Sequence, residues 1–260
     1  MPNPYFRFKQ FTVYQDRCTL RVCTDACILG AWFAGKVPVS SRVLDIGSGT
    51  GLLMLMLAQR HNGGIDGIEL DQASFGQLTD NLANSKWADR LNAFSGDARN
   101  FIFSHKYNFI ISNPPFFEGD LPSLSGRENM AKHSKELTLA ELLDVIDANL
   151  DSSGSFGILL PYHRMDYFEE LASDRRFYLR ERLLVRQTPR HAFFRVILHF
   201  SRNGIGNEPA LPAAADLSAA MGPAKNGLTT PAIQELTIKD NDNRYTVEFE
   251  DLMRDYYLYL

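Results

Sequence analysis

Leu44-Asp45-Ile46-Gly47-Ser48-Gly49-Thr50-Gly51 is the stretch that decides the fold. The apolar residues around it predict a buried strand over 42–46 and a helix over 52–59. Glycines allow the backbone of a turn to approach a ligand closely. Strand, glycine-rich turn and helix in this order form the nucleotide-binding half of a doubly wound α/β fold. We therefore expect this fold, with a nucleoside-type cofactor beside Gly47, Gly49 and Gly51.

Two further predicted strands end near acids that suit such a cofactor. The strand over 64–69 ends at Glu69, 22 residues after Gly47, where a ribose-binding carboxylate is expected. The strand over 91–95 is followed by Asp97 and Ala98, and a carboxylate there can accept a hydrogen bond from an adenine amino group. A turn or a helix cap is the structural alternative for Asp97. We expect Glu69, Asp97 and Ala98 to line the cofactor site, because successive strand ends meet at one edge of such a sheet.

Asp45 discriminates between possible cofactors. Dinucleotides place their pyrophosphate at the glycine-rich turn, and a carboxylate two residues before Gly47 would repel it. S-adenosylmethionine has no phosphate, and it carries an ammonium group that a carboxylate near the turn would attract. The sequence therefore favours S-adenosylmethionine over NAD.

A fourth apolar run, over 107–111, predicts a buried strand that leads into Asn113-Pro114-Pro115-Phe116. Prolines cannot donate to a sheet and hold the residue before them extended, so this strand end is stiff. The Asn113 side chain and a neighbouring carbonyl become fixed acceptors for an NH2 group, and Phe116 offers a flat face beside them. This pattern suits a planar group that carries an exocyclic amine. The alternative is a proline-rich turn without chemistry.

The composition fits one soluble α/β domain with small additions. The chain has 260 residues, 45% of them hydrophobic, and a net charge of −4, so any nucleic-acid surface must be a local patch. No apolar run reaches the length of a membrane span, and residues 1–10 lack a secretory core. We expect a cytoplasmic protein without membrane contact. Cys18, Cys23 and Cys27 have no second cluster beside them, so we expect no metal site.

The N-terminal residues 1–36 predict a small extension packed on the main domain, which runs over 37–260. The extension contains a hairpin, from 6–14 and 19–22, and an apolar helix that begins at Thr24-Asp25. Thr24 and Asp25 are either a cap and a first-turn acid or cofactor contacts. Residues 203–232 change character to Pro, Ala and Gly, and predict an irregular insertion.

Two long β-type runs, 177–188 and 192–201, predict an antiparallel pair that closes the sheet. The segment 175–202 contains eight arginines and a single acid, and arginine suits phosphate groups. We expect RNA contacts from Arg186, Arg190 and Arg195, with a solvated strand face as the alternative. After the insertion, the sequence predicts a hairpin from 235–238 and 245–249, and a helix over 251–260.

The motifs together resemble a known family. The glycine-rich stretch with Asn113-Pro114-Pro115-Phe116 is similar to class I S-adenosylmethionine-dependent methyltransferases that act on amino groups. A finer likeness is carried by FRFKQF, VCTDACILGAW, NPPFFEG, the Lys132-His133 pair and the ending DYYLYL. These segments resemble the bacterial tRNA1(Val) (adenine-37-N6)-methyltransferase family over nearly the whole chain, apart from the insertion.

The resemblance implies a seven-stranded, doubly wound, Rossmann-like methyltransferase sheet. It implies transfer of a methyl group from S-adenosylmethionine to N6 of adenine 37 in the anticodon loop of tRNA1(Val), by a monomer. Asn113, Pro114 and Phe116 would form the catalytic centre, with Asn113 also beside the cofactor. Phe116, Phe117, Lys132 and His133 would contact the substrate, with an ordinary surface or loop histidine as the alternative for His133.

Three alternatives stay open because the Asn-Pro-Pro-Phe motif specifies an NH2 group and not which one. An rRNA guanine-N2 methyltransferase and a protein glutamine methyltransferase would use the same chemistry. A non-catalytic RNA-binding protein on the same fold is an alternative of another class.

Overall fold

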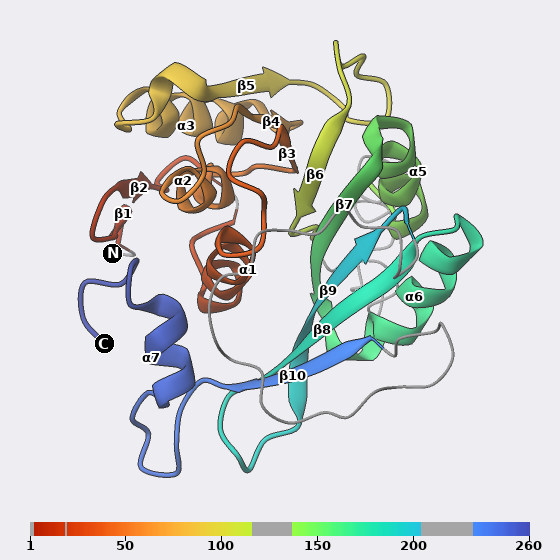
Figure 1. Ribbon diagram of the computed structural model, residues 1–260. Helices are drawn as coiled ribbons and strands as arrows, with labels where there is room; N and C mark the ends of the chain where they lie inside the picture. The colour runs from red at the N-terminus through yellow and green to blue at the C-terminus, as the bar shows by residue number, and fades with distance from the viewer. Residues whose placement is uncertain (1–2, 19, 116–136, 204–230) are drawn as a thin grey trace, which may run out of the picture.

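One mixed sheet of eight strands forms the centre of the computed structural model, which describes residues 3–18, 20–115, 137–203 and 231–260 (Figure 1). Its strands lie in the spatial order β10 (Ala232–Thr237), β8 (Tyr178–Arg186), β9 (Phe193–Ser201), β7 (Leu150–Pro161), β6 (Tyr107–Ser112), β3 (Val43–Ile46), β4 (Ile65–Glu69) and β5 (Leu91–Ser95). The pairs from β7 to β5 are parallel. β9 is antiparallel to β8, as the sequence predicts, and also to β7, while β10 is parallel to β8.

Helices cover both faces of this sheet (Figure 1). One face shares a hydrophobic core with α1 (Thr24–Ala34), α2 (Leu52–Ala58), α3 (Gln72–Ala83) and α7 (Val247–Met253). The other face shares a second core with α5 (Leu139–Asn149) and α6 (Met165–Asp174). Two short 3-10 turns, η1 (Ala88–Arg90) and η2 (Tyr162–Arg164), lie between elements. The predicted doubly wound α/β class is therefore confirmed.

α1 is buried because it lies directly on the sheet. Phe33 packs on Phe109 of β6 with ring centroids 4.9 Å apart. A Cβ added to Gly157 of β7 would lie 2.1 Å from the Phe33 ring, so the glycine makes this close approach possible. Before α1, β1 (Tyr5–Arg7) and β2 (Thr12–Tyr14) form a hairpin. Phe8, which lies between these two strands, forms an isolated bridge with Tyr257 and so joins the two ends of the chain. The division of the chain at residue 36 and the insertion over 203–232 remain predictions.

Four local predictions differ from the structure. The sheet has eight strands rather than seven, because β10 adds a parallel strand to the edge of β8. The N-terminal hairpin forms within residues 5–14, and residues 20–22 form no strand. The strand predicted over 245–249 and the helix predicted over 251–260 are replaced by α7. That helix starts early because Thr246 caps it, accepting a hydrogen bond from the Phe249 N–H at 3.3 Å.

Candidate active site

The carboxyl ends of four neighbouring parallel strands meet at one edge of the sheet. In spatial order these are β6, β3, β4 and β5. The chain passes outward from β3 to β4 and β5 and then returns to β6 on the other side of β3. This reversal is the topological switch point, where open α/β sheets bind their ligands. The register pairs Ile46 with Ser112, which places Gly47 and Asn113 side by side at that point.

The glycine-rich turn after β3 has a backbone that glycine alone adopts readily. Gly47, Gly49 and Gly51 have φ values of 75°, 53° and 82°. Cβ atoms added to Gly47 or Gly49 would meet nothing within 4 Å, whereas one on Gly51 would lie 2.8 Å from Leu78. The first two glycines therefore border open space, as a ligand-binding turn requires. Gly51 instead packs against α3.

Glu69, at the end of β4, holds the glycine-rich turn in place. Its Oε2 accepts a hydrogen bond from the Gly49 N–H at 2.8 Å, and its Oε1 accepts one from the Asp71 N–H at 2.9 Å. Asp71 in turn caps α3 by accepting from the Ser74 N–H at 2.8 Å. The carboxylate predicted to bind ribose thus lies beside the turn predicted to face the cofactor.

Asp45 is completely buried, yet neither of its carboxylate oxygens has a hydrogen-bond partner among the described residues. Burial raises the pKa of Asp45 to about 8, with a further contribution from the nearby charge of Glu69. The Ser48 hydroxyl donates to the Asp45 backbone carbonyl at 2.9 Å, and its effect on the nearby carboxyl lowers the pKa less than burial raises it. A buried acid without a partner is costly, so this group is suited to a cationic ligand group at the turn.

Asn113 is the second unpartnered polar group at this edge. Its Oδ1 is buried and has no hydrogen-bond partner among the described residues. The Ser112 hydroxyl just before it donates to the Ile46 carbonyl at 2.8 Å, which fixes the ends of β6 and β3 together. Pro114 is buried beside Asn113. Phe116 and Phe117, predicted to contact the substrate, lie outside the described residues, as do Lys132 and His133.

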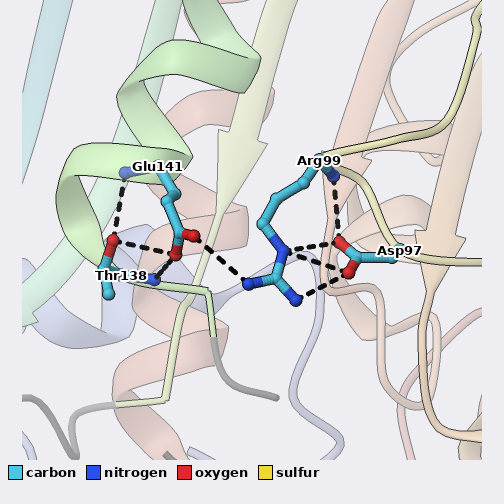
Figure 2. Close-up of polar contacts among 4 residues, drawn as sticks. All are labelled: Asp97, Arg99, Thr138 and Glu141. Carbon is cyan, nitrogen blue, oxygen red and sulfur yellow. Dashed lines mark hydrogen bonds and ion pairs between the residues drawn. The ribbon is translucent and has the colours of Figure 1, made fainter. Parts of the chain in front are cut away.

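Asp97 lies after the end of β5 and is held by an arginine that sequence reasoning missed (Figure 2). Arg99 donates to its carboxylate through Nη2 at 2.6 Å and through Nε at 2.9 and 3.0 Å, and its backbone N–H donates at 3.0 Å. These hydrogen bonds from Arg99 hold the pKa of Asp97 below its usual range. Arg99 also reaches Glu141 on α5 at 3.2 Å. The neighbouring Ala98 is half-buried against the second core.

Thr24 and Asp25 begin α1, but neither caps it through its side chain, because Cys23 occupies the cap position without a side-chain hydrogen bond. Asp25 is a first-turn acid, as one of the two alternatives expected, and its Oδ2 accepts from Arg195 Nε at 2.7 Å. Thr24 lies near the Tyr257 hydroxyl and lowers its pKa less than burial raises it. The structure therefore joins a predicted cofactor residue, Asp25, to a predicted RNA residue, Arg195.

The arginines of segment 175–202 are mostly matched by acids from elsewhere in the chain. Arg186 lies 3.3 Å from Glu235 and donates to the Thr237 hydroxyl at 2.8 Å. Ion pairs at 2.6–2.8 Å also join Arg175 to Asp144, Arg182 to Glu169, Arg195 to Asp25 and Arg202 to Asp147. Arg190 is exposed and makes no ion pair within the described part of the chain. The excess of positive charge along the sequence is therefore much reduced in the folded protein.

Arg99, Glu141 and Asp71 were the residues missed by sequence reasoning. Asp71 carried a usable signal, because an acid directly before a helix is a common cap. Glu141 follows Thr138 by three residues, a spacing that signals only a helix cap, and its second contact crosses to a different strand end. Arg99 had no local signal, since its distant partner lies 42 residues away.

Comparison with known proteins places the chain in a family. It is 43% identical to the tRNA1(Val) (adenine(37)-N6)-methyltransferase of Dyadobacter fermentans over 77% of this chain and 83% of that protein. It is 34% identical to the enzyme of that name from Bacteroides thetaiotaomicron over the full length of both. The chain belongs to the tRNA1(Val) (adenine(37)-N6)-methyltransferase family. The resemblance drawn from the sequence motifs is thereby confirmed.

Further comparisons concern the methyltransferase domain and its fold. A family model described as the methyltransferase small domain matches residues 31–154. A predicted O-methyltransferase from Agrobacterium tumefaciens has a similar fold, with a TM-score of 0.61 at 14% identity over 88% of this chain and 95% of that one. The tRNA m1G37 methyltransferase of M. jannaschii has a TM-score of 0.56 at 14% identity over 76% of this chain and 56% of that one. These likenesses show the class I methyltransferase fold.

Two features of the described residues bear on metals and membranes. Within those residues there is no group of three or more side chains of His, Cys, Asp or Glu that could hold a metal ion. None of the helices in the described part of the chain is long and apolar enough to cross a membrane.

Proposed function

We propose that this protein transfers a methyl group from S-adenosylmethionine to N6 of adenine 37 in the anticodon loop of tRNA1(Val). The observation that carries the proposal is the buried, unpartnered Oδ1 of Asn113, next to the glycine-rich turn at the switch point of the sheet. The relatives of this chain from Dyadobacter fermentans and Bacteroides thetaiotaomicron are named for this activity. A buried acceptor that lacks a partner at a ligand-binding edge is suited to an incoming donor.

The cofactor fits the residues that surround the turn. The unpartnered Asp45 carboxylate suits the ammonium group of S-adenosylmethionine, and the open side of Gly47 and Gly49 gives a ligand access to the backbone. Glu69 would bind the ribose hydroxyls, and Asp97 with Ala98 would bind the adenine. S-adenosylmethionine supplies an electrophilic methyl group on a sulfonium sulfur. The absence of phosphate in this cofactor is consistent with an acid before the turn.

Asn113 and Pro114 would hold the target amine. Asn113 Oδ1 and the Pro114 carbonyl would accept one hydrogen each from the adenine amino group and so orient its nitrogen. Both acceptors would also stabilise the positive charge that develops on nitrogen as it forms its new bond. The nitrogen would gain the methyl group as the methyl–sulfur bond breaks and leaves its electron pair on sulfur. The nitrogen would then lose its extra proton to solvent, so no strong base is needed beforehand. Phe116 would stack on the base, for which comparable nucleic-acid sites give about 1–3 kcal/mol.

The substrate must bring its base out of the stack before this amine can reach Asn113. Such unstacking costs a few kcal/mol and is least costly where the nucleic acid is already single-stranded. A loop adenine beside an anticodon meets this requirement. Since the proposed substrate is tRNA, we place the protein in the cytoplasm. All four strand ends of the site come from one chain, and we propose that a monomer acts.

Methyl transfer to fractionated substrates tests this function. The protein is incubated with tritiated S-adenosylmethionine and with total tRNA, rRNA or protein from a strain that lacks its gene. Nucleoside mass spectrometry then identifies the product. We expect N6-methyladenosine in tRNA at position 37. N2-methylguanosine in rRNA or methylglutamine in protein would instead establish one of the alternatives, and cofactor binding without transfer to any fraction would indicate a non-catalytic protein.

A further inference from the structure

Arg99 lies between two carboxylates that belong to different elements (Figure 2). Its Nε and Nη2 donate hydrogen bonds to the Asp97 carboxylate, the shortest at 2.6 Å. Its Nη1 donates to Glu141 Oε1 at 3.2 Å. Asp97 follows β5, whereas Glu141 lies in the first turn of α5. The side chains of Asp97 and Arg99 are each 26% exposed and that of Glu141 is 39% exposed. These charge-assisted bonds are therefore partly shielded from water, which strengthens them.

Glu141 uses its two oxygens for separate purposes. Oε2 accepts hydrogen bonds from the N–H and the hydroxyl of Thr138, both at 2.9 Å, and Thr138 Oγ1 accepts from the Glu141 N–H at 3.1 Å. This reciprocal arrangement is a capping box, which starts α5. Oε1 is left for Arg99. The cap of α5 and the contact with Arg99 can therefore be disturbed independently by substitution.

We propose that Arg99 is a positioning residue for cofactor binding, which holds the Asp97 carboxylate in place and ties it to the first turn of α5. The proposal rests on the proposed function, which assigns Asp97 to the adenine of the cofactor. A guanidinium is suited to this role because its planar fork fixes both oxygens of a carboxylate at once. A change at Glu141, on a helix beyond the cofactor edge, then weakens cofactor binding through Arg99.

The charge of Arg99 supports the same role. Its hydrogen bonds keep the pKa of Asp97 below the usual range, so the carboxylate stays ionised and remains an acceptor. The pKa of Glu141 is lowered as well, first by its backbone hydrogen bond with Thr138 and also by Arg99. Both acids that flank Arg99 are thus charged at neutral pH.

Calorimetric affinity for S-adenosylhomocysteine tests the proposal on the full chain. We expect Asp97→Asn and Arg99→Gln each to weaken binding about tenfold, the size expected when one hydrogen bond to a charged group is disturbed. Glu141→Gln should weaken it about threefold, and the double variant with Arg99→Gln should be no weaker than Arg99→Gln alone, because the two act in one network. Arg99→Lys keeps the charge without the fork and should restore part of the affinity. In methylation assays, Arg99→Gln should raise KM for S-adenosylmethionine and leave KM for tRNA unchanged.

Two control variants separate this role from a general disturbance of α5. Thr138→Ala removes the helix cap and leaves Glu141 Oε1 for Arg99. Arg175→Gln removes another arginine that binds α5, since Arg175 donates to Asp144 at 2.8 Å and to the Ala140 carbonyl at 3.3 Å. Both should lower the melting temperature and leave the affinity for S-adenosylhomocysteine unchanged.

Several results would overturn the inference. The inference fails if a folded Arg99→Gln binds S-adenosylhomocysteine as tightly as the wild type does. This holds whether or not Asp97→Asn weakens that binding. If Thr138→Ala or Arg175→Gln weakens cofactor affinity equally, the effect of Arg99→Gln comes from disturbed packing of α5. If Arg99→Gln does not fold, the other two variants decide. Wild-type affinity for S-adenosylhomocysteine in both Arg99→Lys and Glu141→Gln would also overturn the inference. Cofactor binding and tRNA methylation by the wild type, measured alongside, report on the proposed function separately.

Discussion

Arg195 of β9 donates to Asp25 at the start of α1, with 2.7 Å between Nε and Oδ2, across 170 positions of sequence. The side chain of Asp25 is 12% exposed and that of Arg195 25% exposed, so the pair is largely shielded. Arg195 lies opposite Pro161, at the carboxyl end of β7. The pair therefore stands at the same edge of the sheet as Asn113, and it neutralises an arginine that sequence reasoning assigned to RNA.

Arg190 is the arginine of this edge with the greatest expected effect on RNA binding. It is exposed in the connection between β8 and β9, and it makes no ion pair with any described residue. Arg190→Ala should weaken tRNA binding and lower the slope of log affinity against log salt by about 0.7–0.9, the value for one lost phosphate contact. Titrations at several salt concentrations measure this slope.

Arg202→Ala is a matched control for that experiment. It removes the same charge from the other end of β9, where Arg202 is paired with Asp147 at 2.6 Å. Its slope should equal that of the wild type. Arg186 and Arg195 are already paired with Glu235 and Asp25, so adding their Ala substitutions to Arg190→Ala should lower the slope less than the first change does. Equal slopes for Arg190→Ala and Arg202→Ala would place the RNA elsewhere.

Asn113→Ala should act on methyl transfer rather than on folding. Its Oδ1 has no partner among the described residues, so its removal breaks no hydrogen bond there. The single-turnover methylation rate with a tRNA carrying adenine 37 should fall about 100-fold, as for loss of one preorganised hydrogen bond in a transition state. Affinity for S-adenosylhomocysteine and the melting temperature should stay near wild-type values.

Asn108→Ala is the corresponding control, with the same residue type on the same strand. Asn108 Oδ1 accepts from the Arg42 N–H at 2.9 Å, close to the opposite end of β6. This variant should lose stability and keep its rate per folded molecule. A folded Asn113→Ala that methylates at the wild-type rate would refute the proposed catalytic centre.

The raised pKa of the buried Asp45 carboxyl leads us to expect that cofactor binding releases a proton. With its pKa raised to about 8 by burial, Asp45 is mostly protonated at pH 7 in the free protein. An ammonium group beside it favours the charged form and lowers that pKa. Calorimetric titration with S-adenosylhomocysteine at pH 7, in buffers of different ionisation heat, should show release of close to one proton. Asp45→Asn should abolish the release, and a buffer-independent heat in the wild type would contradict the prediction.

The same group makes the stability of the free protein depend on pH. Between its ordinary pKa of 3.8 and about 8, the folded protein binds one more proton at Asp45 than the unfolded chain does. The stability contributed by this proton is present at low pH and is lost as pH rises through that window. The melting temperature of Asp45→Asn relative to the wild type should therefore rise between about pH 5 and pH 8. A constant difference would show that Asp45 does not titrate there.

Gly49 and Gly51 should respond differently to the same substitution. Both have positive φ, but a Cβ on Gly49 meets open space and one on Gly51 lies 2.8 Å from Leu78. Gly49→Ala should cost only about 1–2 kcal/mol of backbone strain and should block the cofactor, measured as lost affinity for S-adenosylhomocysteine. Gly51→Ala should lower the melting temperature further because the buried side chain of Leu78 must shift away from the added methyl group. Retention of cofactor affinity in a folded Gly49→Ala would place the cofactor away from this turn.

The sequence by itself determined the elements and the edge where the site forms. Apolar runs and glycine or proline punctuation act locally, so the strands before Gly47 and Asn113 could be recognised one at a time. Parallel connection then brings their carboxyl ends together. The spacing of Thr138 and Glu141 is likewise a local signal, and these two residues form a capping box in the structure. The strand expected over 245–249 shows where local signals fail, because the Thr246 cap outweighs the strand-like composition there.

Tertiary structure alone decided which charges meet and which stay unpaired. Glu235 and Asp25 neutralise arginines far away in sequence, and Glu141 reaches Arg99 from another element. The burial that raises the pKa of Asp45 likewise depends on surrounding elements rather than on its neighbours in sequence. Ion pairing and desolvation depend on distance through space, and the order of residues along a chain does not contain that distance until the sheet has assembled.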